Sequence, residues 1–283
     1  MRGRDAALVA MMLFLAACAD REAANHRDAD GPSTRGWWRP DAEVTWQWQL
    51  TKGTGATVTT SYDVDVYDLD LFDTSPDQIK QLQGDGRRVV CYFSAGSVER
   101  WRDDVGRFGD DDQGEVLDGW PDERWLDLRS GNVRAIMADR LDLAAAKGCD
   151  GVEPDNTDGY ANDTGLDLTR ADTLAYLRWL VGQAHDRGLG IGLKNTLALV
   201  DELAVDFYFA VNEQWHEYEE CPELQPFLDL NKPVLNAEYV EPDSADTAAA
   251  ARARICAQAE AAGTITLILP LALDDGFRVA CNP

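Results

Sequence analysis

Residues 131–155, with the sequence GNVRAIMADRLDLAAAKGCDGVEPD, predict a helix that is followed at once by a β-strand. Apolar residues recur at helical spacing between 131 and 147, and they are Val133, Ile136, Met137, Leu141 and Ala144. Gly148 ends this pattern, as glycine often does just past a helix C-terminus. The run 150–155 then has the length and composition of a short strand. A helix that leads directly into a strand is typical of α/β proteins.

The same alternation recurs along the chain from residue 37 onwards. Further helices are predicted at 76–83, 170–187 and 245–262, and strands are predicted at 44–50, 64–71, 88–94, 150–155, 190–194, 206–212, 233–239 and 264–270. Eight parallel strands are the number that closes a barrel. We therefore expect an α/β fold, a (β/α)8 TIM-type barrel, formed by a single domain at residues 37–283. The long acidic segment 95–130 is expected to form an excursion over one barrel face.

The first 17 residues have the features of a targeting segment. Arg2 and Arg4 precede an apolar run at 6–17, which is too short to span a bilayer and fits a signal-peptide core. The run ends in LAAC at 15–18, which resembles a bacterial lipobox and implies cleavage before Cys18 and lipidation of that cysteine. A plain signal peptide with a chance cysteine is the alternative. We expect an exported protein of the bacterial cell envelope, anchored to the membrane through Cys18 and a flexible polar tether at 18–36.

The composition is strongly acidic. Lys and Arg number 26 against 51 Asp and Glu, which gives a net charge of −25 and a pI of about 4.3. Nucleic-acid binding is not expected, because it needs a basic surface. Anionic lipid surfaces would also repel the domain, so its only expected membrane contact is the lipid on Cys18. The charge suits a cationic partner or a well-solvated exported protein, and we expect a monomer.

Cysteine and histidine usage bears on disulfides and metals. Five cysteines besides Cys18 are present, and they are Cys91, Cys149, Cys221, Cys256 and Cys281. Cys91 and Cys149 lie at predicted strands that could be neighbours, so they could form a disulfide, while Cys221 could pair with Cys256 or Cys281. The chain has no C-x-x-C, H-x-H or H-E-x-x-H pattern and only three histidines. We therefore expect no metal site and no cofactor.

Polar residues recur at the predicted strand ends, where a TIM barrel carries its chemistry. Those that we expect at the mouth are Trp48, Asp68, Asp70, Tyr92, Ser94, Glu153, Asp155, Lys194, Asn195, Glu213, Glu238 and Tyr239. Glu153 and Asp155 share one face of their strand, so Glu153 should lie one layer deeper, with Lys194 as its partner. Two carboxylates across a cleft are what glycoside hydrolysis requires. Aromatic residues near the mouth could stack on sugar rings.

Several runs resemble one family. They are VCYFSAGS at 90–97, GWPDERWLD at 119–127, CDGVEPDN at 149–156, GLKN at 192–195, FAVNEQ at 209–214 and AEY at 237–239. Together they are similar to the endo-α-1,4-polygalactosaminidases of glycoside hydrolase family 114, over about residues 37–281. The resemblance implies a TIM-type barrel that cleaves α-1,4-linked galactosamine polymers, with catalytic acids at Asp155 and Glu213. It departs at Trp215, where many relatives carry cysteine.

The resemblance leads to a hypothesis for the roles. Asp155 is the nucleophile or base and Glu213 the general acid, with Glu238, Asp68 and Asp70 binding the substrate and its ammonium groups. Lys194 and Asn195 orient carboxylates or sugar hydroxyls, and Trp48, Tyr92, Ser94 and Tyr239 also contact substrate. An alternative catalytic pair is Asp155 with Glu238. Alternative functions are a lipid-anchored sugar-binding barrel without activity and a hydrolase of another α-galactoside.

Overall fold

The computed structural model describes residues 36–51, 58–218, 220, 223–240 and 245–282. The expected signal peptide, Cys18, the tether up to residue 35 and Cys221 lie outside these residues. Within the described part of the chain, no helix has the length and apolar character needed to cross a bilayer.

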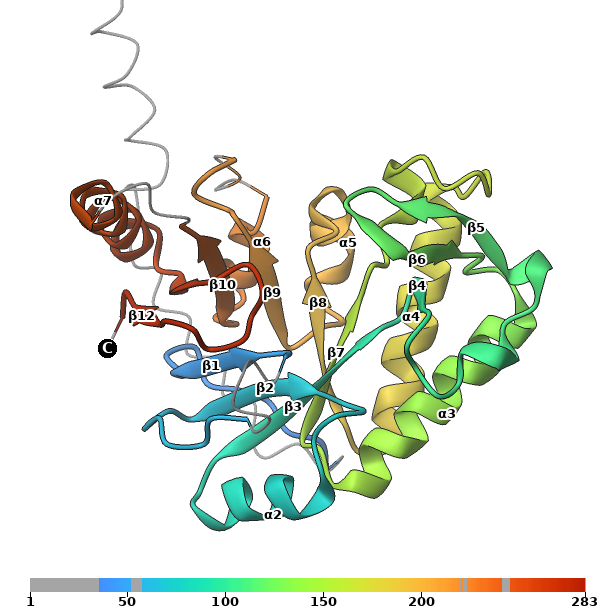
Figure 1. Cartoon of the computed structure of the whole chain (residues 1–283), viewed down its shortest axis with the longest axis horizontal. Helices are drawn as coiled ribbons and strands as arrows, with labels where there is room; N and C mark the ends of the chain where they lie inside the picture. The colour runs from blue at the N-terminus through green and yellow to red at the C-terminus, as the bar shows by residue number, and fades with distance from the viewer. Residues whose placement is uncertain (1–35, 52–57, 219, 221–222, 241–244, 283) are drawn as a thin grey trace, which may run out of the picture.

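Eight parallel strands form the main sheet, and each overlaps one of the eight predicted runs. In spatial order the sheet contains β1 (Trp46–Gln49), β2 (Val66–Asp70), β3 (Arg88–Ser94), β7 (Gly151–Asp155), β8 (Gly190–Lys194), β9 (Phe209–Glu213), β10 (Val234–Tyr239) and β11 (Ile265–Leu269), with β12 (Val279–Ala280) antiparallel to β11 at the edge. The sheet curls into a TIM-barrel-like arrangement (Figure 1). The fold-class prediction is confirmed.

The two ends of the curled sheet are joined mainly by side chains. Among the described residues, β1 and β11 share no strand ladder. Instead, the Trp46 indole N–H donates to the Ile265 carbonyl at 3.2 Å, and the Arg278 guanidinium donates to the Trp46 carbonyl at 2.8 Å. The amides of residues 50 and 51 also donate to the carbonyl of Leu273. These contacts hold the barrel together where the strands do not pair.

The four predicted helices begin and end close to their expected positions, and they are α2 (Pro76–Gly84), α3 (Gly131–Lys147), α4 (Arg170–Asp186) and α7 (Ala245–Ala262). Two short helices, α5 (Val200–Leu203) and α6 (Gln225–Asp229), were not predicted. The Ser130 side chain accepts from two amides at the start of α3. Gly148, with φ of 88°, ends α3 in the left-handed region that glycine adopts without steric cost. Buried apolar side chains of α3 and α4 pack against the outer face of the sheet.

The segment 95–130 forms a second, small sheet, which the sequence did not predict. It contains β4 (Ser97–Glu99), β6 (Trp120–Leu126) and β5 (Gln113–Leu117), all antiparallel, and lies over α3 and α4 beside the C-terminal ends of the barrel strands (Figure 1). Buried Arg102 contacts both Glu99 and Asp70, which joins this segment to β2. A Cβ at Gly96 would lie 1.7 Å from the Asn156 carbonyl oxygen, so only glycine permits this close approach to the end of β7.

Two disulfides are present. Cys91 is bonded to Cys149, as expected, and links β3 to the short segment between α3 and β7. Cys256 is bonded to Cys281 and links α7 to the C-terminal segment. The expected pairing of Cys221 with one of these two is therefore wrong, because they bond to each other. That pairing failed because cysteine spacing alone does not determine connectivity.

Removal of the Cys91–Cys149 disulfide should destabilise the protein without changing its fold. The bridge closes a loop with a sequence separation of 58, and such a crosslink restricts the unfolded chain. We expect a Cys91→Ala, Cys149→Ala variant to lose about 2–4 kcal/mol of unfolding free energy. Urea titration with and without reductant measures this. The wild type should lose stability on reduction, and equal stability of wild type and variant under oxidising conditions would contradict the prediction.

Candidate active site

Three neighbouring strands bring the central residues together. Asp155, Lys194 and Glu213 are the last residues of β7, β8 and β9. Parallel strands in adjacent positions end at the same edge of a sheet, so these side chains meet. The residue after each strand has a positive φ, and these residues are Asn156, Asn195 and Gln214. This conformation turns the chain sharply and ends each strand at the site.

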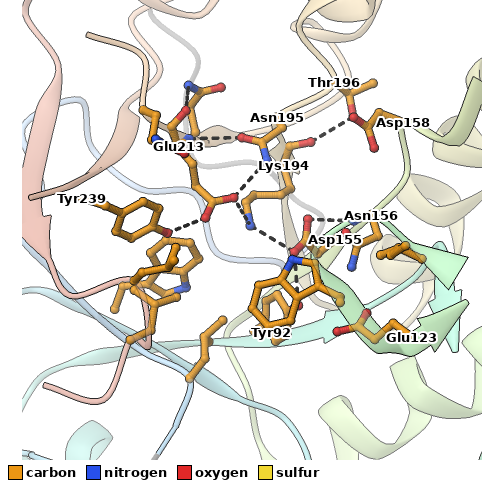
Figure 2. A pocket seen from close by; sticks show the side chains of 18 of the residues that line it. Tyr92, Glu123, Asp155, Asn156, Asp158, Lys194, Asn195, Thr196, Glu213 and Tyr239 are labelled. Carbon is orange, nitrogen blue, oxygen red and sulfur yellow. Dashed lines mark hydrogen bonds and ion pairs between the residues drawn. The ribbon is translucent and has the colours of Figure 1, made fainter. Parts of the chain in front are cut away.

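Lys194 lies between three carboxylates and is almost fully buried. Its Nζ is 3.1 Å from Asp155 Oδ2, 3.2 Å from Glu213 Oε2 and 3.2 Å from Glu153 Oε1. Figure 2 shows the ammonium group between Asp155 and Glu213. Burial opposes the charge of Lys194, but the surrounding carboxylates raise its pKa well above the ordinary value. The lysine therefore remains protonated and counters their mutual repulsion.

Asp155 accepts hydrogen bonds from two further donors. The Tyr92 hydroxyl donates to Oδ2 at 3.1 Å, and the Asn156 amide donates to Oδ1 at 2.7 Å. Tyr92 lies on β3 and Asn156 just after β7, so two elements fix the carboxylate. The side chain retains 15% of its accessible surface, which leaves it open to the cavity above.

Glu213 is fixed in a similar way. Its Oε1 accepts from the Tyr239 hydroxyl on β10, and its Oε2 accepts from Asn195 Nδ2 at 3.1 Å. Asn195 also accepts from the Glu213 amide at 3.1 Å. Burial alone would raise the pKa of Glu213, but the Lys194 ammonium and these hydrogen bonds hold it below the ordinary value. Glu213 is therefore ionised in the free protein at neutral pH.

Two more carboxyl groups lie beneath this pair. Glu153 is fully buried and accepts from the Trp48 indole N–H at 3.2 Å. Burial raises the pKa of Glu153 to about 7, with the Lys194 ammonium opposing the rise. Burial also raises the pKa of Asp68 well above its ordinary value, and the neighbouring carboxylate of Glu153 adds to the rise. Neither Asp68 oxygen has a hydrogen-bond donor among the described residues, so the raised pKa lets this buried carboxyl group keep its proton. Glu153 is thus a deep partner of Lys194, as expected.

A cavity of about 1150 Å³ opens above the three strand ends. Many of the expected site residues line it, and they are Trp48, Asp70, Tyr92, Asp155, Lys194, Asn195, Glu213 and Tyr239. Asp70 is nearly buried and makes a two-point ion pair with Arg102, at 3.0 Å and through a shorter contact of 2.5 Å. That pairing makes Asp70 part of the cavity wall and leaves it little capacity to bind a ligand cation.

Three expected substrate contacts lie away from the cavity. Asp68 is fully buried in the layer below, and Ser94 is covered by Ser97 and Asn156. Glu238 is 2% exposed and accepts from the His216 amide and Asn236 Nδ2. Neighbouring residues of a strand face opposite sides, and on β10 it is Tyr239 that reaches the cavity. The expected roles of these residues in direct substrate contact, and the alternative pair Asp155 with Glu238, are therefore corrected.

The cavity also contains residues that the sequence did not identify. The most prominent are Trp101, Trp120, Glu123, Asn156, Asp158, Tyr160 and Tyr218. The first three come from the segment 95–130, where no strand was predicted. A usable signal existed, because Trp120 and Glu123 fall within the run 119–127 that resembles the family.

In the part of the chain that the structure describes, no group of three or more His, Cys, Asp or Glu side chains is arranged to hold a metal ion. The site places two carboxylates on either side of one ammonium group. Such an arrangement can transfer a proton and attack or activate a nucleophile at a bound sugar.

The comparisons with known proteins agree with this chemistry. The model of glycoside-hydrolase family GH114 matches residues 28–283. The structure of Ega3 from Aspergillus fumigatus in complex with galactosamine is 41% identical, with a TM-score of 0.80, and the match covers 89% of this chain and 100% of that one. The glycoside hydrolase domain of PelA from Pseudomonas aeruginosa is 17% identical and shares the fold, with a TM-score of 0.67 and coverage of 83% and 98%. No curated protein matches the sequence.

The match to the family model extends over the whole barrel domain and includes the strand ends that carry Asp155, Lys194 and Glu213. The barrel fold and the paired carboxylates at its mouth are what a glycoside hydrolase requires. The chain belongs to glycoside-hydrolase family GH114.

Proposed function

We propose that this glycoside hydrolase cleaves α-1,4-linked galactosamine polysaccharide at internal bonds, with Asp155 and Glu213 as its catalytic pair. The observation that carries the proposal is the position of Lys194 Nζ, within 3.2 Å of both carboxylates at the base of the cavity. Both groups face the same space, so a sugar bound there can contact both.

The same distances favour a mechanism that retains the anomeric configuration. Asp155 Oδ2 and Glu213 Oε2 lie 3.1 Å and 3.2 Å from one nitrogen atom, so these oxygens are at most about 6.3 Å apart. Retaining enzymes place their carboxyl groups about 5–5.5 Å apart, whereas inverting enzymes need about 6.5–9.5 Å to admit a water molecule. The upper limit of about 6.3 Å between Asp155 Oδ2 and Glu213 Oε2 is shorter than the separation that inverting enzymes need.

Asp155 is then the nucleophile. Its carboxylate attacks the anomeric carbon while Glu213 gives a proton to the departing glycosidic oxygen. Glu213 next takes a proton from water, which displaces Asp155 and restores both groups. Because Glu213 is ionised in the free protein, it must gain its proton with the substrate. A bound sugar that covers the partly exposed carboxylate excludes water and so raises its pKa.

The substrate class is supported by charge and by similarity. Ega3, 41% identical to this chain, was solved with galactosamine. Protonated amino groups along such a polymer match the net charge of −25 and the carboxylates around the cavity. Long-range attraction between the two should weaken as salt is added.

The test compares three polymers, namely α-1,4-galactosamine, its N-acetylated form and neutral α-galactan. The release of new reducing ends is measured together with product length. We expect cleavage of the galactosamine polymer into intermediate oligosaccharides, slower cleavage at higher salt, and little cleavage of neutral galactan. Release of only the terminal sugar would contradict endo action, and preference for neutral galactan would contradict the substrate.

A further inference from the structure

The carboxylates that line the cavity differ in their partners. Asp155 and Glu213 share Lys194, and Glu99 and Asp70 share Arg102. Glu123 also lines the cavity, yet among the described residues it makes no ion pair, and its one hydrogen-bond donor is Ser97. Glu123 is therefore a carboxyl group at the cavity wall that has no ion-pair partner in the part of the chain that the structure describes.

Glu123 is nonetheless held firmly in place. It lies on β6, is 7% exposed, and accepts through Oε2 from the Ser97 hydroxyl at 2.5 Å. Ser97 is within hydrogen-bonding distance of Asn156 Nδ2, and the Asn156 amide donates to Asp155. This chain of contacts fixes Glu123 relative to the proposed nucleophile. Figure 2 shows Glu123 on the small sheet, on the Asp155 side of the site.

Two aromatic side chains from the same segment also line the cavity. Trp101 follows β4 and Trp120 begins β6, and each is 55% exposed although it lines the cavity. Large exposed aromatic residues beside a cleft are well suited to stack on the apolar faces of sugar rings. The segment that forms the small sheet therefore presents a buried carboxyl group together with two exposed aromatic side chains.

We propose that Glu123 binds the ammonium group of a galactosamine unit on the small-sheet side of the cavity, with Trp101 and Trp120 packing against neighbouring sugar rings. This inference rests on the proposed function and names a substrate-binding residue that selects for the free amine. It assigns to Glu123 the ammonium-binding role that the sequence had suggested for Asp68, Asp70 and Glu238.

The physical basis for selection is the cost of a buried charge. Burial raises the pKa of Glu123 to about 7, with the nearby carboxylates of Glu99 and Asp155 adding to the rise and Ser97 and Arg102 opposing it. An ammonium group would stabilise the ionised form through a charge-assisted hydrogen bond. A neutral N-acetyl group supplies no counter-charge. The site should therefore discriminate between galactosamine and its acetylated form.

The experiment compares wild type, Glu123→Gln and the control Asp122→Asn. Asp122 is exposed on the same strand and does not line the cavity, so its variant removes an equal charge away from the site. For galactosamine oligosaccharides we expect Glu123→Gln to raise KM about 10-fold, as for the loss of one charged hydrogen bond, with kcat changed less than about 3-fold. The preference of Glu123→Gln for galactosamine oligosaccharides over acetylated ones should be smaller than that of the wild type by a similar factor. Asp122→Asn should match wild type.

Binding measured without turnover separates this inference from the proposed function. Titration calorimetry with a galactosamine oligosaccharide is performed on Asp155→Asn and on Asp155→Asn, Glu123→Gln. Weaker binding by the double variant supports the role of Glu123 even if the wild type cleaves no galactosamine polymer. Equal binding by both variants, with equal preference for acetylated oligosaccharide, would overturn the role of Glu123 and leave the proposed function intact.

Discussion

Asp155→Asn is expected to lower kcat on a galactosamine polymer by at least about 10³-fold, and Glu213→Gln by about 10²–10⁴-fold. The first substitution removes the proposed nucleophile. The second removes the proposed general acid, and loss of such a group typically costs about 10²–10⁴-fold in rate. Both are nearly isosteric, and the amide oxygens that they introduce can still accept from the hydroxyls of Tyr92 and Tyr239. Initial rates of reducing-end release measure the loss.

The roles of the two groups can be separated by the leaving group. An aryl glycoside whose leaving group departs without protonation should recover most of the lost rate in Glu213→Gln and little in Asp155→Asn. The matched control is Glu238→Gln, a carboxylate on the next strand that lies away from the cavity and contacts His216 and Asn236. This variant should retain most activity. A loss in Glu238→Gln as large as in Glu213→Gln would contradict the assigned pair.

The barrel was predictable from the sequence because its strands and helices carry strong local signals. Helix α3 was predicted at its observed bounds, since its apolar spacing ends at Gly148, a residue suited to the left-handed cap. The small sheet carries no comparable signal. Its strand β6 contains Pro121 and three exposed residues at its start, so the alternation of a half-buried strand is absent.

The site was predictable to the extent that strand ends define it. Asp155, Lys194 and Glu213 meet because β7, β8 and β9 are parallel neighbours. Strand alternation explains the error at Glu238. Ala237 pairs with Glu213 in register, so Tyr239, two residues later, shares that face, whereas Glu238 faces the opposite side. The error at Asp68 has a different cause. Asp68 faces the same side of β2 as Asp70, but it lies one layer deeper in the barrel and so does not reach the cavity.

Lys194→Met is expected to damage both stability and catalysis. It leaves Glu153 buried without its cation and removes the ammonium that separates Asp155 from Glu213. Removing one partner of a buried ion pair costs about 3–5 kcal/mol. Denaturant unfolding measures this cost, and kcat should fall at least about 10²-fold, because the two mechanistic carboxylates lose their shared partner.

The destabilisation by Lys194→Met should increase with pH. Glu153 has a raised pKa of about 7 beside Lys194, and without the ammonium that pKa rises further. At pH 5 Glu153 of the variant is protonated and neutral, so the loss of unfolding free energy is small. At pH 8 the unfolded chain has released this proton. The folded variant must then either bury an unpaired Glu153 carboxylate or keep the proton, and both reduce its stability. Stability of the variant therefore falls relative to wild type as pH rises from 5 to 8.

A second substitution isolates the origin of that cost. In Lys194→Met, Glu153→Gln the unpaired charge of Glu153 is gone, while Asp68 beneath the site keeps its raised pKa. Stability at pH 8 should therefore recover in part while activity remains low, because Asp155 and Glu213 still lack their ammonium. Lys232→Met is the control, since Lys232 donates to backbone carbonyls at Ala204 and Phe207 and does not line the cavity. It should lose stability and keep activity. Recovery of activity in the double variant would show that Lys194 acts only by neutralising Glu153, and the site would then need no ammonium between its two catalytic carboxylates.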